Sequence, residues 1–161
     1  MVLLLALPYP ASAQQQHRKL HIVTTGDVHG SWFREPFVDG GRMKNSLSCV
    51  SYYVDSLRKA AGAGNVLFFD LGDCIQGSNA AYYANFVADS TQPHLFTRIA
   101  KYVGYDGIVA GNHDLETGHA VYDRLYSELS DAGIPMLAAN FLKEGSDESY
   151  FFPYEVVYWE G

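Results

Sequence analysis

The fold is decided by the stretch Val66-Leu67-Phe68-Phe69, an apolar run that leads into Asp70-Leu71-Gly72-Asp73-Cys74-Ile75-Gln76-Gly77. A continuous apolar run of this length is typical of a strand that is buried on both faces. The same arrangement recurs at two other places, where His21-Ile22-Val23-Thr24-Thr25 leads into Gly26-Asp27-Val28-His29-Gly30 and Gly107-Ile108-Val109-Ala110 leads into Gly111-Asn112-His113-Asp114. Each time, glycine and an oxygen-bearing side chain directly follow a predicted strand.

Segments with helical periodicity separate these strands. Apolar residues recur every three or four positions in 45–61 and 119–132, which predicts two amphipathic helices. Two further helices are expected at about 80–88 and 93–102, and two further strands at 135–139 and 154–159. Strands that alternate with helices predict an α/β fold, with a mainly parallel or mixed sheet and helical crossovers.

The composition fits one globular domain. The chain has 161 residues, of which 48% are hydrophobic and 18% charged, so it is too apolar for a disordered chain. A net charge of −7 disfavours binding to nucleic acid or to anionic lipid. Two cysteines are too few for a disulfide scaffold. An oxidising compartment would permit a Cys49–Cys74 disulfide, and a pair of buried free thiols fits the sequence equally well.

Residues 1–13 have the pattern of a secretory signal peptide. Val2-Leu3-Leu4-Leu5-Ala6-Leu7 is a short apolar run, and Ala11-Ser12-Ala13 is a small-x-small cleavage site. The run is too short to cross a bilayer as a helix, so no membrane span is expected after its removal. This pattern predicts a secreted or periplasmic protein with a mature N-terminal tail at 14–19. The alternative interpretation of residues 1–13 is a disordered apolar tail.

The polar residues after the three strands are candidates for a metal site. In a parallel sheet the carboxyl ends of the strands share one edge, where ligands bind. This places Asp27, Asp73 and Asn112 together, and His29 lies two positions after Asp27, on the same side of an extended segment. Such oxygen and nitrogen ligands suit Mn²⁺, Fe, Zn²⁺, Co²⁺ or Mg²⁺. The alternative is that each Gly-Asp is only a turn and that Asn112 or Asp114 caps a following helix.

Together these motifs resemble the calcineurin-like metallophosphoesterases, in particular their 5′-nucleotidase branch. The similar segments are Thr24-Thr25-Gly26-Asp27-Val28-His29-Gly30, Asp70-Leu71-Gly72-Asp73-Cys74-Ile75-Gln76-Gly77-Ser78, Ala110-Gly111-Asn112-His113-Asp114 and Pro135-Met136-Leu137-Ala138-Ala139-Asn140. The resemblance implies half of a metallophosphoesterase-type β-sandwich flanked by helices. Residues 20–161 would be the N-terminal portion of that catalytic domain, because the predicted strand at 154–159 leaves an unfinished sheet edge.

The resemblance also implies a metal centre and a reaction. Asp27 and His29 would bind a first divalent ion, Asp73 would bridge to a second, and Asn112 would bind the second. The protein would be a phosphoric ester hydrolase similar to 5′-nucleotidases, in which a hydroxide activated by two metal ions attacks phosphorus in line. The expected substrate is a nucleotide or another small phosphate ester.

The same resemblance assigns roles to the residues that follow Asn112. His113 would be the catalytic histidine, Glu116 its acidic partner, and Asp114 a cap of the following helix. The family also has a further metal-binding His and a Gly-His-x-His segment downstream, and neither occurs in these 161 residues. The alternative function is therefore a catalytically deficient fragment, or a non-catalytic metal-binding or interaction module on the same scaffold.

Three aromatic residues lie in the loop after the first motif. Trp32, Phe33 and Phe37 follow Gly30 closely in the sequence, so their rings are expected near the candidate site. They either line an opening to that site or pack against one another within the loop.

Overall fold

The computed structural model describes residues 18–35, 37, 41–42 and 44–159. The predicted signal peptide at 1–13 and most of the tail at 14–19 lie outside these residues. The strands are β1 (His21–Thr25), β2 (Val66–Asp70), β3 (Gly107–Val109) and β4 (Met136–Leu137), and the helices are α1 (Leu47–Ala61), α2 (Asn79–Phe86), α3 (Leu95–Val103), α4 (Asn112–Leu115) and α5 (His119–Asp131), with a 3-10 turn at Ala63–Asn65. This order of elements confirms the predicted α/β fold.

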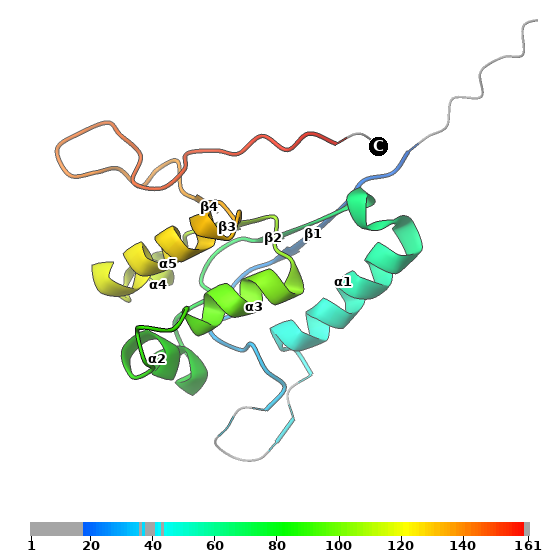
Figure 1. The fold of residues 1–161 in the computed structure, drawn as a ribbon, viewed down its shortest axis with the longest axis horizontal. Helices are drawn as coiled ribbons and strands as arrows, with labels where there is room; N and C mark the ends of the chain where they lie inside the picture. Colours follow the sequence, from blue (N-terminus) through cyan, green and yellow to red (C-terminus); the bar gives the residue numbers. More distant parts are fainter. Residues whose placement is uncertain (1–17, 36, 38–40, 43, 160–161) are drawn as a thin grey trace, which may run out of the picture.

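The strands form one parallel sheet in the order β1-β2-β3-β4. The spatial order of the strands equals their order in the chain, so every crossover runs in the same direction across the sheet. Right-handed crossovers then place the connecting helices on one face of the sheet. Figure 1 shows α1, α3 and α5 on the same side of the sheet. Thr25 pairs with Asp70 in the register, and Asp70 pairs with Ile108. The three predicted motifs therefore leave the sheet along one edge.

The helices form where the apolar periodicity predicted them, with small shifts at their ends. α1 begins at Leu47 rather than Asn45, because Ser46 has an extended backbone and is the N-cap. The helix buries Leu47 and Val54, contacts β2, and ends at Gly62. The bounds of α2, α3 and α5 lie within two residues of the predicted ones. The short helix α4 was not predicted as a separate element.

The predicted strand at 154–159 is wrong, because these exposed residues form no strand. The preceding segment touches β4 through a single parallel bridge between Leu137 and Phe152, and Trp159 Nε1 donates to Asn65 Oδ1 at 3.1 Å. An apolar sequence forms a strand only where a neighbouring strand completes its ladder of hydrogen bonds. Within the described residues no strand pairs with 154–159. β4 is likewise shorter than the predicted 135–139.

Two expectations about the environment of the chain can be compared with the structure. Cys49 and Cys74 are not joined by a disulfide, and Cys74 is buried while Cys49 is half-buried. Burial, with Asp70 beside it, raises the pKa of the Cys74 thiol well above its ordinary value, so the sulfur keeps its proton. Among the described residues, no helix has the length and apolar character needed to cross a membrane.

Candidate metal centre

The loop after β1, residues 26–30, carries Asp27 and His29 in a left-handed backbone conformation. Their φ angles are 52° and 48°, in a region that costs residues other than glycine about 1 kcal/mol or more. The backbone N–H groups of Asp27, His29 and Gly30 donate to the carbonyls of residues 72–74 at 2.8–3.0 Å. This β1 loop therefore takes its shape from the loop after β2.

The loop after β2, residues 71–77, presents Asp73, which also has a left-handed φ of 59°. The carboxylate of Asp114 holds this β2 loop, because it accepts hydrogen bonds from the N–H groups of Asp73, Cys74 and Ile75 at 2.8–3.0 Å. A fourth N–H, that of Gly111, donates to the same carboxylate at 2.9 Å. Burial raises the pKa of Asp114, and these four N–H groups oppose that rise.

The role predicted for Asp114 is therefore wrong. Asp114 was expected to cap the helix that follows, but the N-cap of α5 is Gly118, which has no side-chain hydrogen bond. Asp114 instead lies inside the separate short helix α4, is 2% exposed, and faces the β2 loop about forty residues earlier in the chain. It joins the second and third motifs to each other.

Helix α4 approaches Asp73 so closely that a side chain at position 111 would collide with it. A Cβ atom on Gly111 would lie 2.2 Å from Asp73 Oδ1 and 2.5 Å from its backbone nitrogen. The N–H of His113 donates to Asp73 Oδ1 at 2.9 Å. The Asp73 carboxylate is thus held between the β2 loop and the first turn of α4, which brings His113 to the site.

Three side chains of these loops form a possible metal-binding group. His29, Asp73 and His113 each offer one ligand atom, and these atoms all lie within 4.8 Å of one another. Two ligands on opposite sides of one ion, each about 2.1 Å away from it, are about 4.2 Å apart. The group is therefore close to the spacing that a single ion requires, and its nitrogen and carboxylate donors suit Mn, Fe, Co or Zn.

His29 is oriented as histidine ligands usually are. Its Nδ1 lies 3.1 Å from the carbonyl oxygen of Gln76, to which the Nδ1–H can donate. This tautomer leaves the lone pair of Nε2 available, and Nε2 lies 3.8 Å from Asp27 Oδ1. A backbone acceptor on the far ring nitrogen fixes the ring and makes the near nitrogen a better ligand.

His113 and Glu116 lie within hydrogen-bond distance of each other. His113 Nδ1 is 2.9 Å from Glu116 Oε2. This hydrogen bond raises the pKa of His113, and desolvation opposes the rise. The longer glutamate side chain therefore reaches the imidazole. The predicted catalytic roles of the two residues are not tested by this geometry.

The structure places the predicted ligands Asp27 and Asn112 beside the group of three. The Asp27 side chain is 81% exposed and close to His29. Asn112 is the first residue of α4 and is exposed, between Gly111 and His113, which both lie against Asp73. The four predicted metal ligands thus come from one small region, and their assignment to two ions stays a prediction.

Asp70 is a further residue of interest beside the candidate site, although no role was predicted for it from the sequence. Asp70 is the last residue of β2 and is 0% exposed. Along β2 the residues alternate between buried and half-buried, and Asp70 lies on the buried face together with Val66 and Phe68. A carboxylate at a buried position needs hydrogen-bond donors, so its position alone marks it as a residue with a structural or functional partner.

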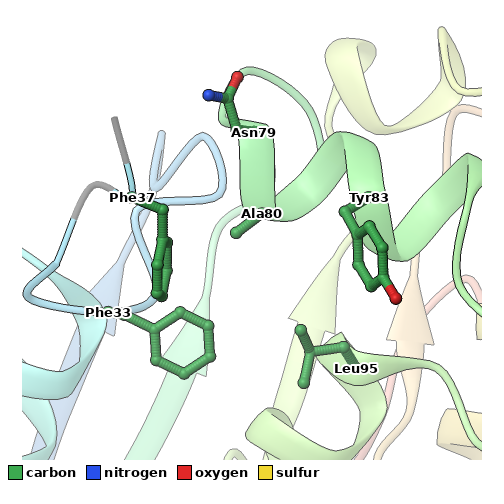
Figure 2. A pocket seen from close by; sticks show the side chains of 6 residues that line it. All are labelled: Phe33, Phe37, Asn79, Ala80, Tyr83 and Leu95. Carbon is green, nitrogen blue, oxygen red and sulfur yellow. The ribbon is translucent and has the colours of Figure 1, made fainter. Parts of the chain in front are cut away.

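A cavity of about 300 Å³ lies close to the β1 loop (Figure 2). Its lining is apolar apart from Asn79 and the Tyr83 hydroxyl, and consists of Phe33, Phe37, Asn79, Ala80, Tyr83 and Leu95. A smaller hollow shares Phe33, Phe37 and Ala80 with it and extends to Gly30, the residue after His29.

Trp32 is not at this opening, because its buried ring stacks on Phe96 with centroids 5.6 Å apart. Phe33 and Phe37 both line the cavity and pack edge to face, 5.8 Å apart.

The chain has named relatives by sequence, although no family model matches it. It is 28% identical over 146 residues to the protein UshA of Escherichia coli, and 27% identical over 145 residues to the 5′-nucleotidase of Vibrio cholerae. Each match covers 89% of this chain and 24% of the relative. The chain therefore spans about a quarter of the length of the relatives it matches.

Solved structures share the fold. The calcineurin-like phosphoesterase YfkN of Bacillus subtilis superposes with a TM-score of 0.72 over 83% of this chain and 40% of that one, at 24% identity. The NAD nucleotidase NadN of Haemophilus influenzae gives a TM-score of 0.63 over 88% of this chain and 24% of that one, at 21% identity. The chain thus has the fold of a calcineurin-like phosphoesterase and is similar to UshA and a 5′-nucleotidase over about nine tenths of its own length, which confirms the resemblance that the three motifs predicted.

Proposed function

We propose that this chain belongs to a metal-dependent phosphoric ester hydrolase of the 5′-nucleotidase type. Within it, residues 20–161 would be the N-terminal portion of the catalytic domain. The observation that carries the proposal is the convergence of His29, Asp73 and His113 at one edge of the sheet, with ligand atoms within 4.8 Å of one another. The similarity to UshA and to a 5′-nucleotidase supports the same reaction class.

In this proposal some residues of the chain hold metal ions and others act on the phosphate ester. Asp27 and His29 would hold a first divalent ion, Asn112 would hold a second, and Asp73 would contribute a ligand to both. The ions would act as Lewis acids for attack on phosphorus and offset the negative charge of the phosphoryl oxygens. His113, kept more basic by Glu116, stabilises the phosphoryl oxygens or gives a proton to the leaving oxygen.

The substrate proposed is a nucleotide or another small phosphate ester. The names of the relatives support a nucleotide. The cavity lined by Phe33 and Tyr83 is apolar and begins next to Gly30, so it lies where the organic part of an ester could extend from the metal-binding loops. Export to the periplasm or outside the cell is part of the proposal, and the residues that would direct it lie outside the described ones.

The test combines metal binding with turnover. Calorimetry with Mn²⁺ should detect tight binding by the chain. The chain and any longer product of the same reading frame should be assayed with AMP and with p-nitrophenyl phosphate. Asp73→Asn should abolish turnover. The control is Asp106→Asn, which makes the same chemical change at a carboxylate that accepts from the backbone N–H of Phe68, and it should preserve turnover. Absence of turnover with every divalent ion tried would contradict the proposal.

A second candidate function is a non-catalytic metal-binding or interaction module. It is favoured by the small size of the ligand group, since among the described residues one set of three His, Cys, Asp or Glu side chains reaches metal-binding distances. This function predicts a single weakly bound ion and no turnover. Two tightly bound ions per chain would rule it out.

A further inference from the structure

The carboxylate of Asp70 is the most completely buried acidic group beside the metal-binding loops, and nothing so far has given it a function. Asp70 ends β2 and is 0% exposed, and it lies three positions before Asp73 in the sequence. Removing a carboxylate from water is costly, so such a group persists only where donors surround it. The identity of its donors indicates what the group does.

One oxygen of this carboxylate holds the two neighbours of Asp73. Oδ1 accepts from the Gly72 N–H at 2.8 Å and from the Cys74 thiol at 2.7 Å. Asp73 lies between these two contacts, with its left-handed φ of 59°. This conformation costs free energy even for aspartate, which tolerates it better than most residues, so hydrogen bonds that hold its neighbours stabilise it. The two bonds to Oδ1 impose it from both sides in the sequence.

The other oxygen holds the end of β1. Oδ2 accepts from the Thr25 hydroxyl at 2.5 Å and from the Tyr105 hydroxyl at 3.1 Å, and the two hydroxyl oxygens are 2.6 Å apart. Thr25 is the last residue of β1, and Gly26 and Asp27 follow it directly. The two oxygens of Asp70 therefore connect the start of the β1 loop to the residues that flank Asp73.

We propose that Asp70 is a positioning residue, whose buried carboxylate sets the relative placement of the metal ligands Asp27 and Asp73. This inference rests on the proposed function, because it takes those two residues as ligands. Asp70 contacts no ligand side chain directly in the hydrogen bonds above, and it acts through Thr25, Gly72 and Cys74. Groups that hydrogen-bond directly to a metal ligand typically change metal affinity about 10- to 100-fold when they are removed, and Asp70 acts one residue further away.

The first test compares two replacements of Asp70 of similar shape. Asp70→Leu removes both acceptors and should weaken Mn²⁺ binding about tenfold or more, measured by calorimetry at a temperature where circular dichroism shows the variant folded. Asp70→Asn should retain most of the affinity, because its amide oxygen can accept from Gly72 and Cys74 while the hydroxyls of Thr25 and Tyr105 turn to accept from its NH₂. Equal affinities of Asp70→Leu and the unaltered chain would overturn the inference.

A second pair remains available where Asp70→Leu fails to fold. Cys74→Ala removes one donor to Oδ1 with little change in volume, and Cys74→Ser keeps a donor there. The inference predicts weaker Mn²⁺ binding for the alanine variant than for the serine variant, with Asp106→Asn unchanged as the control. Equal affinity of the alanine and serine variants would contradict it.

A third readout needs no metal. In ¹H–¹⁵N spectra of the metal-free chain, loss of the Asp70 carboxylate should shift the amide resonances of both loops, residues 26–29 and 72–75. Shifts confined to 72–75 would overturn the claim that Asp70 sets both loops. If the unaltered chain binds no Mn²⁺, the proposed function itself is contradicted. If the unaltered chain and Asp70→Leu bind Mn²⁺ equally, only the inference about Asp70 is contradicted.

Discussion

The loops after β1 and β2 share a sequence pattern, an apolar strand followed by Gly-Asp, yet they are held in different ways. Two buried carboxylates, Asp70 and Asp114, accept hydrogen bonds from the β2 loop. The β1 loop instead donates three backbone N–H groups to carbonyls of the β2 loop, and its Asp27 side chain is 81% exposed. The β2 loop is therefore the rigid part of the site, and the β1 loop is shaped on it.

This difference separates stability from binding. Substitutions that release the β2 loop should lower the stability of the fold and damage the metal site together. Substitutions at the exposed proposed ligands of the β1 loop should damage metal binding alone, because few contacts of the fold depend on them.

The largest effect is expected at Asp114. Asp114→Ala leaves four backbone N–H groups without their acceptor, three of them in the β2 loop, and should lower the free energy of unfolding by roughly 4 kcal/mol. Asp27→Ala is the matched variant in the β1 loop, at an exposed proposed ligand. It should change the free energy of unfolding by less than about 0.5 kcal/mol while still weakening Mn²⁺ binding. Urea unfolding and calorimetry on both variants measure the two quantities. Equal losses of stability would break the comparison between the loops.

Acid should weaken the support of the β2 loop through His94. The side chain of Asn85 donates to the Ile75 carbonyl at 2.7 Å, and His94 Nε2 lies 3.1 Å from Asn85 Oδ1. His94 Nδ1 accepts from the Phe96 N–H, so the ring is neutral in the folded chain. Burial, with the positive charge of Arg124 nearby, lowers the pKa of His94 from 6.5 to about 4, while Glu128 opposes the shift.

The direction of the pH dependence follows from this pKa. Between 6.5 and about 4 the unfolded chain binds a proton at His94 and the folded chain does not. Stability should therefore fall as the pH is lowered through this window, by up to about 3 kcal/mol. Urea unfolding from neutral pH down to about pH 4 measures the slope. His94→Gln should flatten it, and an unchanged slope in that variant would assign the acid sensitivity to other groups.

The parts of the structure that the sequence predicted correctly are those with local signals. Apolar runs followed by glycine and an oxygen-bearing side chain predicted β1, β2 and β3, and apolar periodicity predicted α1 and α5. The strand predicted at 154–159 failed because a strand also needs a neighbour, and an apolar run contains no information about whether one is present.

The site shows the same limit. Asp27, Asp73 and Asn112 could be selected as candidates because each closely follows a predicted strand. His29 could be selected because it lies two positions after Asp27. The long-range hydrogen bonds of Asp114 to the β2 loop and of Asp70 to Thr25 could not be predicted, since they join segments about forty residues apart in the chain. Only the folded sheet brings those segments together, so their hydrogen bonds leave no local pattern in the sequence.

An intermediate effect is expected where α4 meets the β2 loop. Gly111→Ala would place a Cβ atom 2.2 Å from Asp73 Oδ1, so α4 and the β2 loop must move apart, which should lower stability by about 2 kcal/mol and weaken Mn²⁺ binding. Gly64→Ala is the matched control, because a Cβ atom there has no other atom within 4 Å. Thermal unfolding measures the stability of both variants, and calorimetry measures their Mn²⁺ binding. Similar results for the two variants would remove the steric argument for glycine at position 111.

The smallest effect is expected at Ser78, which connects the β1 loop to α2. Its hydroxyl donates to the Gly30 carbonyl at 2.8 Å and accepts from the Ala81 N–H at 3.1 Å as the helix N-cap. Ser78→Ala should lower stability by about 1 kcal/mol. Ser56→Ala, whose exposed hydroxyl donates only to the Tyr52 carbonyl within α1, should change it little. Because Ser78 holds the β1 loop, amide hydrogen exchange in Ser78→Ala should accelerate at residues 29–31 and stay unchanged at 73–75. Acceleration at 73–75 would mean that the β1 loop also supports the β2 loop.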